Sequence, residues 1–238
     1  MLKMNNIRKV FRTEVVETHA LRDFSLQVNE GEFVAVTGPS GSGKTTFLNI
    51  AGLLETITAG EYFLDGVDVK DLNDNQRSKL RNEKIGFIFQ SFNLIPDLNL
   101  FDNVDVPLRY RSMNAKERKE RIENALDIVG LANRMKHIPA QLSGGQQQRV
   151  AIARALAGSP RFLLADEPTG NLDSAMAESV MELLEDINSK GTTIIMVTHD
   201  PKLALRAPRS IAVKDGKVSE VSRVESPVEM PLHEPALA

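Results

Sequence analysis

Short hydrophobic runs alternate with longer amphipathic stretches along most of the chain. Four of these runs are continuously apolar, as expected for strands that are buried on both faces of a parallel sheet. They are Phe33–Thr37, Ile85–Phe89, Phe162–Ala165 and Thr193–Val197. Strands of this kind, separated by helical patterns, predict an α/β fold.

Strands of a second kind are expected nearer the N-terminus. Ile7–Phe11, Phe24–Val28 and Glu61–Leu64 alternate apolar and polar positions, which favours an antiparallel sheet with one solvated face. Late in the chain, Val213–Val218 predicts a hairpin that turns at Asp215 and Gly216. We therefore expect a small antiparallel sheet beside the parallel one.

Between about Asn99 and Gly158 no strong strand pattern is found. Within it, Ala115–Val129 has an apolar stripe opposite a charged face, which predicts an amphipathic helix. The stripe consists of Ile122, Ala125, Leu126 and Val129. We expect a helical subdomain of about residues 91–158, inserted into a domain of residues 1–221.

Composition limits the possible functions. Hydrophobic residues make up 42% and charged residues 26%, an ordinary globular mixture. A net charge of −3 argues against a nucleic-acid partner, and the absence of cysteine excludes disulfides and thiolate metal sites. The longest apolar runs fall well short of the roughly 18 residues that cross a bilayer, so any membrane component is expected in another chain. Proline recurs among small and acidic residues in 222–238, which predicts a disordered tail.

The strongest chemical signal is the run from Gly38 to Thr45, which fits G-x-x-x-x-G-K-[ST] between an expected strand and an expected helix, Thr45–Leu54. Glycines let backbone N–H groups turn toward phosphate oxygens, and the helix N-terminus adds a positive dipole. Lys44 is expected to reach the β- and γ-phosphates, and the Thr45 hydroxyl to bind Mg²⁺. The alternative is a glycine-rich turn that only caps a helix. The expected ATP contacts are Gly38, Pro39, Ser40, Gly41, Ser42, Gly43, Lys44, Thr45 and Thr46.

Two carboxylates follow the apolar run Phe162–Ala165. Asp166, at the end of the strand, is expected in the Mg²⁺ shell. Glu167 would face the γ-phosphate and act as general base toward the attacking water. Surface acids at the start of a helix are the alternative for this pair.

A second glycine-containing helix start, Ser143-Gly144-Gly145-Gln146, follows Leu142. A serine hydroxyl and glycine amides at a helix N-terminus form another anion site. One nucleotide cannot obviously use two such loops about 100 residues apart. The simplest resolution is a head-to-tail pair of chains, in which each ATP lies between one chain's phosphate loop and the partner's Ser143–Gln146.

The ordered motifs GPSGSGKT, Gln90, LSGGQ, FLLADE, Asn171-Leu172-Asp173 and His199 resemble those of the ABC-type ATPases over about residues 5–221. The resemblance implies a P-loop NTPase core with an antiparallel β subdomain and an inserted α-helical subdomain. It also implies that Gln90 binds metal and senses water, and that His199 is the switch histidine at the γ-phosphate. Asp173 would carry signals between the two sites of the dimer.

One position departs from the family pattern. A tyrosine usually stacks on the adenine, and the matching residue here is Phe11, followed by an inserted-looking stretch from Arg12 to His19. Phenylalanine can also stack on a base. A core role in the side sheet is the alternative for Phe11.

Three segments resemble one branch more closely, the ATPases of lipoprotein release and of macrolide or peptide export: Asn49–Glu55, Ile85–Pro96 and Gly170–Asp173. This resemblance implies a separate permease subunit and a place on the cytoplasmic face of a bacterial inner membrane. The alternative is an ATPase of a non-transporting signalling complex. A soluble ABC protein of translation or DNA repair is disfavoured because the chain has one cassette and no long heptads.

The permease is expected to contact residues Gln90–Asp102, where Phe92, Leu94 and Ile95 lie beside Gln90. Packing inside the helical subdomain is the alternative for Phe92 and Leu94. A basic cluster nearby could meet lipid headgroups, but a solvated helix face mixed with glutamates is favoured. The cluster comprises Arg109, Arg111, Lys116, Arg118, Lys119 and Arg121.

Overall fold

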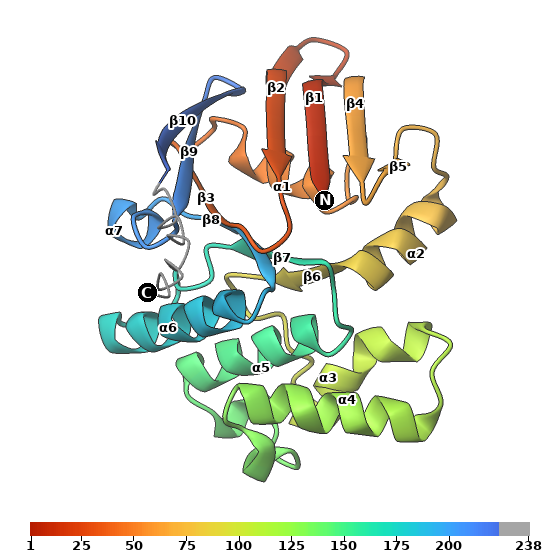
Figure 1. The fold of residues 1–238 in the computed structure, drawn as a ribbon, viewed down its shortest axis with the longest axis vertical. Coiled ribbons are helices and arrows are strands. Elements are labelled where there is room, and N and C mark those ends of the chain that lie inside the picture. The colour runs from red at the N-terminus through yellow and green to blue at the C-terminus, as the bar shows by residue number, and fades with distance from the viewer. Residues whose placement is uncertain (224–238) are drawn as a thin grey trace, which may run out of the picture.

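The computed structural model describes residues 1–223, with side chains described up to residue 219. Figure 1 shows a sheet-rich upper part and a helical lobe below it. The lobe is inserted between β6 and β7, as the sequence predicts. Strand β10 continues to Arg223, so residues 222 and 223, expected in the tail, pair with β9. The rest of the expected tail lies outside the described residues.

The main sheet has six strands in the order β10-β9-β3-β8-β7-β6, and only β10 runs antiparallel to its neighbour. The four predicted apolar strands form its centre and one edge, and the hairpin at Asp215-Gly216 is confirmed by two successive positive φ angles, 51° and 74°. The strands are β3 (Phe33–Thr37), β6 (Ile85–Ile88), β7 (Phe162–Asp166), β8 (Thr193–Val197), β9 (Arg209–Lys214) and β10 (Lys217–Arg223).

The alternating side chains of the central strands supply two separate hydrophobic cores. Phe33 and Ala35 face the core shared with the helical lobe and α6, while Val34 and Val36 face the core shared with the side sheet and α1. Each central strand is therefore buried on both faces. This double burial is the physical reason for the continuous apolar runs.

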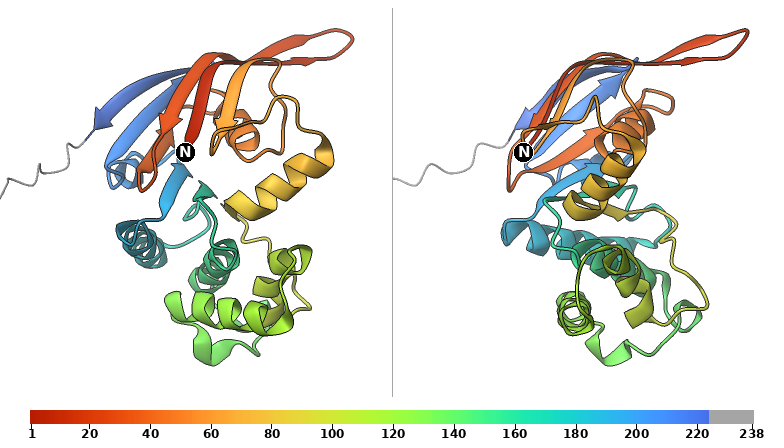
Figure 2. Two further views of the ribbon diagram at one scale, coloured as in Figure 1. Left: turned by 45° about the vertical axis from the view of Figure 1, so that its right-hand side comes forward. Right: turned by 90° about the vertical axis from the view of Figure 1, so that its right-hand side faces the viewer.

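The expected antiparallel sheet has four strands in the order β2-β1-β4-β5. Its first two strands are longer than predicted, and the stretch from Arg12 to His19 is the end of a projecting hairpin (Figure 2). A cross-strand ion pair between Arg12 and Glu17 accompanies the pairing in the part of the hairpin that resembles a polar loop in sequence. The strands are β1 (Leu2–Arg12), β2 (Glu17–Val28), β4 (Ala59–Leu64) and β5 (Val67–Asp68).

Helices cover both sheets and build the lobe. The predicted amphipathic helix is α4, whose buried residues Ile122, Ala125 and Leu126 lie on the predicted stripe. Helix α1 is shorter than expected because Leu53, just after Gly52, adopts a left-handed φ of 57°. The α-helices are α1 (Lys44–Ala51), α2 (Asp74–Lys84), α3 (Leu100–Asp105), α4 (Ala115–Ile128), α5 (Gly144–Leu156), α6 (Ser174–Ser189) and α7 (Pro201–Ala204). Three short 3₁₀ turns are η1 (Val106–Tyr110), η2 (Ala132–Arg134) and η3 (Pro139–Gln141).

The basic cluster of the lobe is paired within the chain. Arg109 and Arg118 bind the buried carboxylate of Asp105 at 2.7 and 2.9 Å. Arg111 donates to the backbone carbonyls of Asn82 and Gly158. Lys116, Lys119 and Arg121 each pair with a glutamate one helical turn away. This internal pairing agrees with a solvated, self-neutralised face and gives no support to a lipid site.

Candidate functional site

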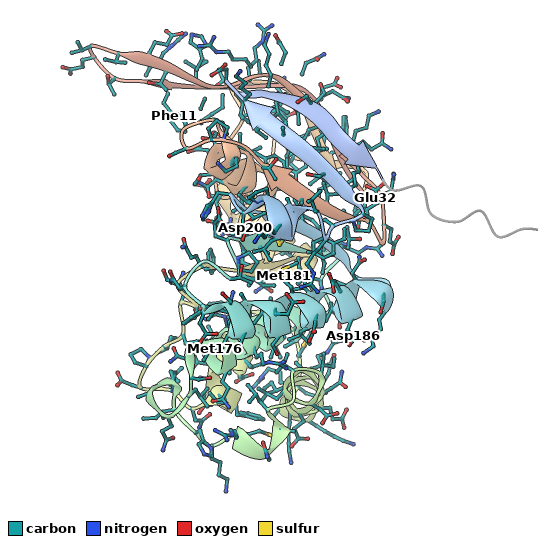
Figure 3. All side chains as sticks on the ribbon, turned by 90° about the vertical axis from the view of Figure 1, so that its left-hand side faces the viewer. Phe11, Glu32, Met176, Met181, Asp186 and Asp200 are labelled. Carbon is teal, nitrogen blue, oxygen red and sulfur yellow. The ribbon has the colours of Figure 1, made fainter. Side chains whose placement is uncertain are left out.

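The candidate site lies along the carboxyl edge of the main sheet. The phosphate loop follows β3, Gln90 lies two residues after β6, Asp166 ends β7, and His199 lies two residues after β8. Neighbouring parallel strands end at the same edge, so these four segments meet there, although they are far apart in sequence. In Figure 3, Phe11, Asp200 and Met176 are labelled along one side of the molecule, and Glu32 and Asp186 along the other.

The phosphate loop is packed against two neighbouring segments. A Cβ at Gly38 would lie 2.1 Å from the carbonyl oxygen of Val213, and a Cβ at Gly43 would lie 2.6 Å from that of Ala20. Both glycines also have positive φ angles, 144° and 107°. Only glycine fits such positions, because any side chain would meet fixed backbone.

Polar groups of this loop are arranged for an anion. Lys44 Nζ donates to the carbonyl oxygens of Gly38 and Pro39 at 2.6 and 2.9 Å, which places its charge over the curl of the loop. Ser42 Oγ is buried and lacks a hydrogen-bond partner in the described structure. An unpaired buried hydroxyl is costly unless a ligand or water satisfies it, so this loop fits phosphate oxygens.

The two predicted carboxylates have different environments. Burial raises the pKa of Asp166 above its ordinary value, the charge of Glu167 raises it further, and Lys44 opposes the rise. Glu167 has a left-handed φ of 47°, and its Oε1 accepts a hydrogen bond of 2.8 Å from Nδ1 of His199. The structure thus brings Lys44, Asp166, Glu167 and His199 to one place.

A metal ion would need oxygen donors from several segments. No group of three His, Asp or Glu residues within residues 1–223 could hold a metal unaided. Thr45, Asp166 and Gln90 supply a hydroxyl, a carboxylate and an amide at the same sheet edge. Such hard oxygen ligands suit Mg²⁺, which is commonly completed by phosphate oxygens and water. The donor set therefore fits a metal carried in with a nucleotide.

Two side chains support this edge that sequence reasoning left without a role: Gln148, which it missed, and Asn171, which it used only as part of a motif. Gln148, fully buried on α5, donates to the carbonyl oxygen of Pro168 at 2.6 Å, and Pro168 directly follows Glu167. Asn171 donates to the carbonyl oxygen of Gln90 at 3.0 Å. The signal for Gln148 was available, because it lies on the same helical face as the buried Ala151 and Ile152. A polar residue on an apolar face commonly serves a specific partner.

The start of α5 does not belong to this cluster within one chain. Ser143 caps the helix, and its Oγ accepts from the Gln146 amide in a capping box. Gly145 donates to the sulfur of Met176 at 3.3 Å, and a Cβ at Gly144 would contact Leu172. These contacts run to residues on either side of Asp173, which itself caps α6. The phosphate loop instead packs on β2 and β9, so each of the two predicted anion-binding loops has its own surroundings.

Phe11 lies at the end of β1 and is 41% exposed, so it is not a core residue of the side sheet. It pairs with Thr18 across the hairpin. Ala20, two residues further along β2, is the contact of Gly43 in the phosphate loop. The ring therefore stands on the hairpin that borders this loop.

A large groove lies elsewhere, between α2, β6, η1 and the end of α5. Its volume is about 1040 Å³, and its walls include Phe89, Asn93, Tyr110 and Met113. Leu94 packs against the helical core, while Ile95 is 42% exposed. None of the helices in the described part of the chain combines the length and hydrophobicity that a bilayer crossing requires.

Comparison with known proteins gives a consistent result. A family model described as "ABC transporter" matches residues 21–170. YknY, an ABC transporter ATP-binding protein of Bacillus subtilis (strain 168), is 46% identical over 222 residues, which cover 93% of this chain and 96% of that protein. The macrolide export ATP-binding/permease protein MacB of Syntrophobacter fumaroxidans is 48% identical over 225 residues, which cover 93% of this chain and 32% of that protein.

Solved structures agree with the sequence matches. The dimeric post-hydrolysis state of the ATP-binding cassette MJ0796, bound to ADP and Pi, has a TM-score of 0.84 and 44% identity, covering 95% of this chain and 100% of that chain. MJ0796 comes from Methanocaldococcus jannaschii. The predicted fold, an ATPase core with an antiparallel β subdomain and an inserted helical subdomain, is confirmed. The chain therefore belongs to the family of ABC transporter ATP-binding proteins.

Proposed function

We propose that this chain binds and hydrolyses ATP as one half of a dimer and thereby drives a separate membrane permease. The observation that carries the proposal is the cluster at the carboxyl edge, where the pair of Glu167 and His199 lies beside Lys44 and Asp166. This arrangement supplies a cation for phosphate, a metal ligand and a base in one place. A glycine-rich turn alone would need none of these groups.

In the proposed reaction, the phosphate loop from Gly38 to Thr46 binds the triphosphate through its amides and Lys44. Mg²⁺, held by Thr45, Asp166 and Gln90, would neutralise the charge of the β- and γ-phosphates. Glu167 accepts a proton from the attacking water, and its hydrogen bond to His199 sets the direction of the carboxylate. The same contact positions His199 to sense the γ-phosphate.

The second half of the site is supplied by another copy of the chain. Ser143, Gly144, Gly145 and Gln146 form a helix tip on the other lobe, where Ser143 is exposed and the phosphate loop of the same chain makes no contact with them. The similar MJ0796 cassette was solved as a dimer, which supports this arrangement. Asp173 would link the two sites: its carboxylate accepts from the Met176 amide, and the Met176 sulfur accepts from the amide of Gly145, which supports this role.

The groove walled by Phe89, Asn93, Tyr110 and Met113 is proposed as the docking site of the permease. Its wall residues Phe89 and Asn93 lie one residue before and three residues after Gln90, so movement at the nucleotide would reach the docked segment. The name of MacB joins an ATP-binding part to a permease, and our chain matches 32% of that protein. We therefore place this chain on the cytoplasmic face of a bacterial inner membrane, bound through a permease that exports or extracts peptides, lipoproteins or drug-like molecules. An ATPase that drives signalling without transport uses the same site.

Hydrolysis is tested by phosphate release from two variants. Lys44→Ala should lose nucleotide binding, because the charge-assisted phosphate contact disappears. Glu167→Gln should retain ATP binding and lose about 10²-fold or more in turnover. Parental turnover in Glu167→Gln would show that another group is the base. Glu182→Gln, an exposed change on α6, serves as the control.

The docking groove is tested by cross-linking, since the chain has no cysteine. Tyr110, 82% exposed in the groove wall, can be changed to cysteine and labelled with a photoreactive group. In native membranes this label should form an adduct with an integral membrane protein. Val15→Cys, at the exposed hairpin tip, should form little. Equal labelling from both positions would show that the permease does not dock in this groove.

A further inference from the structure

Lys9 is an unusual lysine, because it is only 8% exposed on β1, an inner strand of the side sheet. Lysine is almost never this buried unless its charge is paired. Lys9 and Phe11 are two positions apart on β1, so their side chains stand on the same face of the strand.

The charge of Lys9 is anchored to the segment after α1. Its Nζ lies 2.8 Å from Oε1 of Glu55, four residues beyond the end of the helix that the phosphate loop begins. The hydrogen bond from Lys9 is the main cause of the lowered pKa of Glu55. The same Oε1 also accepts the Thr56 amide at 2.8 Å, which fixes the carboxylate. The ion pair therefore ties β1 to the element that carries the phosphate loop.

The same ammonium group lies over the ring of Phe11, 4.8 Å from the ring centre. A cation at this distance is attracted to the negative face of an aromatic ring. The cation covers one face of the ring, and 41% of the residue remains exposed. A flat base could stack on the uncovered face, so that base, ring and cation would form three layers.

We propose that Lys9 is a positioning residue for the nucleotide base. Held by Glu55, it fixes the Phe11 ring at a set place relative to the phosphate loop and so strengthens binding of nucleotides over bare phosphates. The inference rests on the proposed function, in which Phe11 stacks on adenine. Two connections set the distance between the Phe11 ring and the phosphate loop. They are the ion pair of Lys9 and Glu55, and the packing of Gly43 against Ala20 in the hairpin.

The test compares two ligands that share a diphosphate, ADP and inorganic pyrophosphate, by titration calorimetry at constant Mg²⁺. Lys9→Met keeps the length of the side chain and removes its charge. It should weaken ADP binding about three- to tenfold and leave pyrophosphate binding unchanged. Lys9→Arg, which keeps a cation, should restore ADP binding. Lys3→Met, at an exposed lysine of the same strand, is the matched control.

A purely structural role gives a different pattern. If Lys9→Met weakens both ligands equally, or neither, the proposal is wrong. Glu55→Gln keeps the cation and removes its anchor, so it should also weaken ADP binding but not pyrophosphate binding. This variant takes the place of Lys9→Met if Lys9→Met does not fold. If neither Lys9→Met nor Glu55→Gln weakens ADP binding more than pyrophosphate binding, the inference is overturned.

Phe11→Ala separates this inference from the proposed function. If it weakens ADP selectively while Lys9→Met and Glu55→Gln do not, only the role of Lys9 falls. If Phe11→Ala leaves the ratio of ADP to pyrophosphate affinity unchanged, the base platform itself is wrong and the role of Lys9 falls with it.

Discussion

Glu167 combines a strained backbone with a constrained side chain. Its φ of 47° is a conformation that costs a non-glycine residue about 1–3 kcal/mol. Its amide donates to the carbonyl oxygen of Val197 at 2.9 Å, and Gln148 binds the carbonyl of the next residue, Pro168. These two hydrogen bonds hold the turn that aims the carboxylate at His199. The strain is thus stored where the proposed base needs a fixed direction.

Replacing Gln148 by leucine should weaken this turn. The Pro168 carbonyl would lose its buried donor, which costs about 1–3 kcal/mol in the free energy of unfolding. Turnover should fall more than nucleotide affinity, because the change acts on the direction of Glu167. Urea unfolding and steady-state kinetics measure the two effects. A fully active and equally stable Gln148→Leu protein would contradict the role given to this hydrogen bond.

Replacing Asp166 should raise stability and abolish activity, whereas replacing Gln148 should lower both. Burial raises its pKa, so the folded state holds the proton more tightly than the unfolded state. Stability is therefore lost as the pH rises from the ordinary aspartate pKa through the raised one. In EDTA, Asp166→Asn should have a higher melting temperature than the parent at pH 7.5, and the difference should shrink toward pH 4. A constant difference across this range would show that ionisation is not the cause, and with Mg²⁺ the variant should be inactive.

At the scale of elements, the phosphate loop depends on the hairpin of β9 and β10. Gly216 donates to the carbonyl oxygen of Ser42 at 3.0 Å, and Val213 lies against Gly38. The loop is therefore shaped by a strand that follows it by more than 170 residues. The shape of the loop thus depends on packing against a distant segment as well as on its own sequence.

Gly38→Ala tests this packing. A Cβ there would lie 2.1 Å from the Val213 carbonyl oxygen, in addition to the cost of a positive φ. Gly31→Ala is the matched control, since its φ is 80° but no atom lies within 4 Å of the added Cβ. The control should lose about 1 kcal/mol in the free energy of unfolding, and Gly38→Ala should lose about 1–3 kcal/mol more. Equal losses would mean that the hairpin can move aside freely.

Sequence-based prediction succeeded for elements whose burial leaves a clear pattern. The central strands were predicted because both of their faces enter a core, and α4 because one face does. Helix α2 was missed because none of its residues is buried, and the hairpin of β1 and β2 was underestimated because charged residues form its outer part. The site motifs were recognisable locally, but the contacts of Lys9 and Gln148 were not. Their partners, Glu55 and Pro168, lie far along the chain, so only the fold reveals the contacts.

At the scale of the whole molecule, the described residues form a sheet-rich part and a helical lobe, joined by a hydrophobic core that both share, and a second core lies within the sheet-rich part. The sheet-rich part carries the phosphate loop, and the helical lobe carries the start of α5 with Ser143–Gln146 (Figure 1). The lobe also supplies more than half of the residues that line the groove. Gln148 joins α5 to the turn after Glu167, and Arg154 on the same helix donates to the carbonyl of Phe92, two residues past Gln90. When the phosphate of a nucleotide bound to the partner chain contacts this helix tip, the effect would therefore reach both Glu167 and the groove.

The central claim is that two chains enclose each ATP, and light scattering of the Glu167→Gln protein tests it most directly. With ATP and Mg²⁺ the molar mass should double from that of the 26.3 kDa chain, and without nucleotide it should return to the monomer. Adding Ser143→Arg in the same background should keep the protein monomeric while ATP still binds. A protein that binds ATP at saturation and stays monomeric, or a dimer unaffected by Ser143→Arg, would contradict the account.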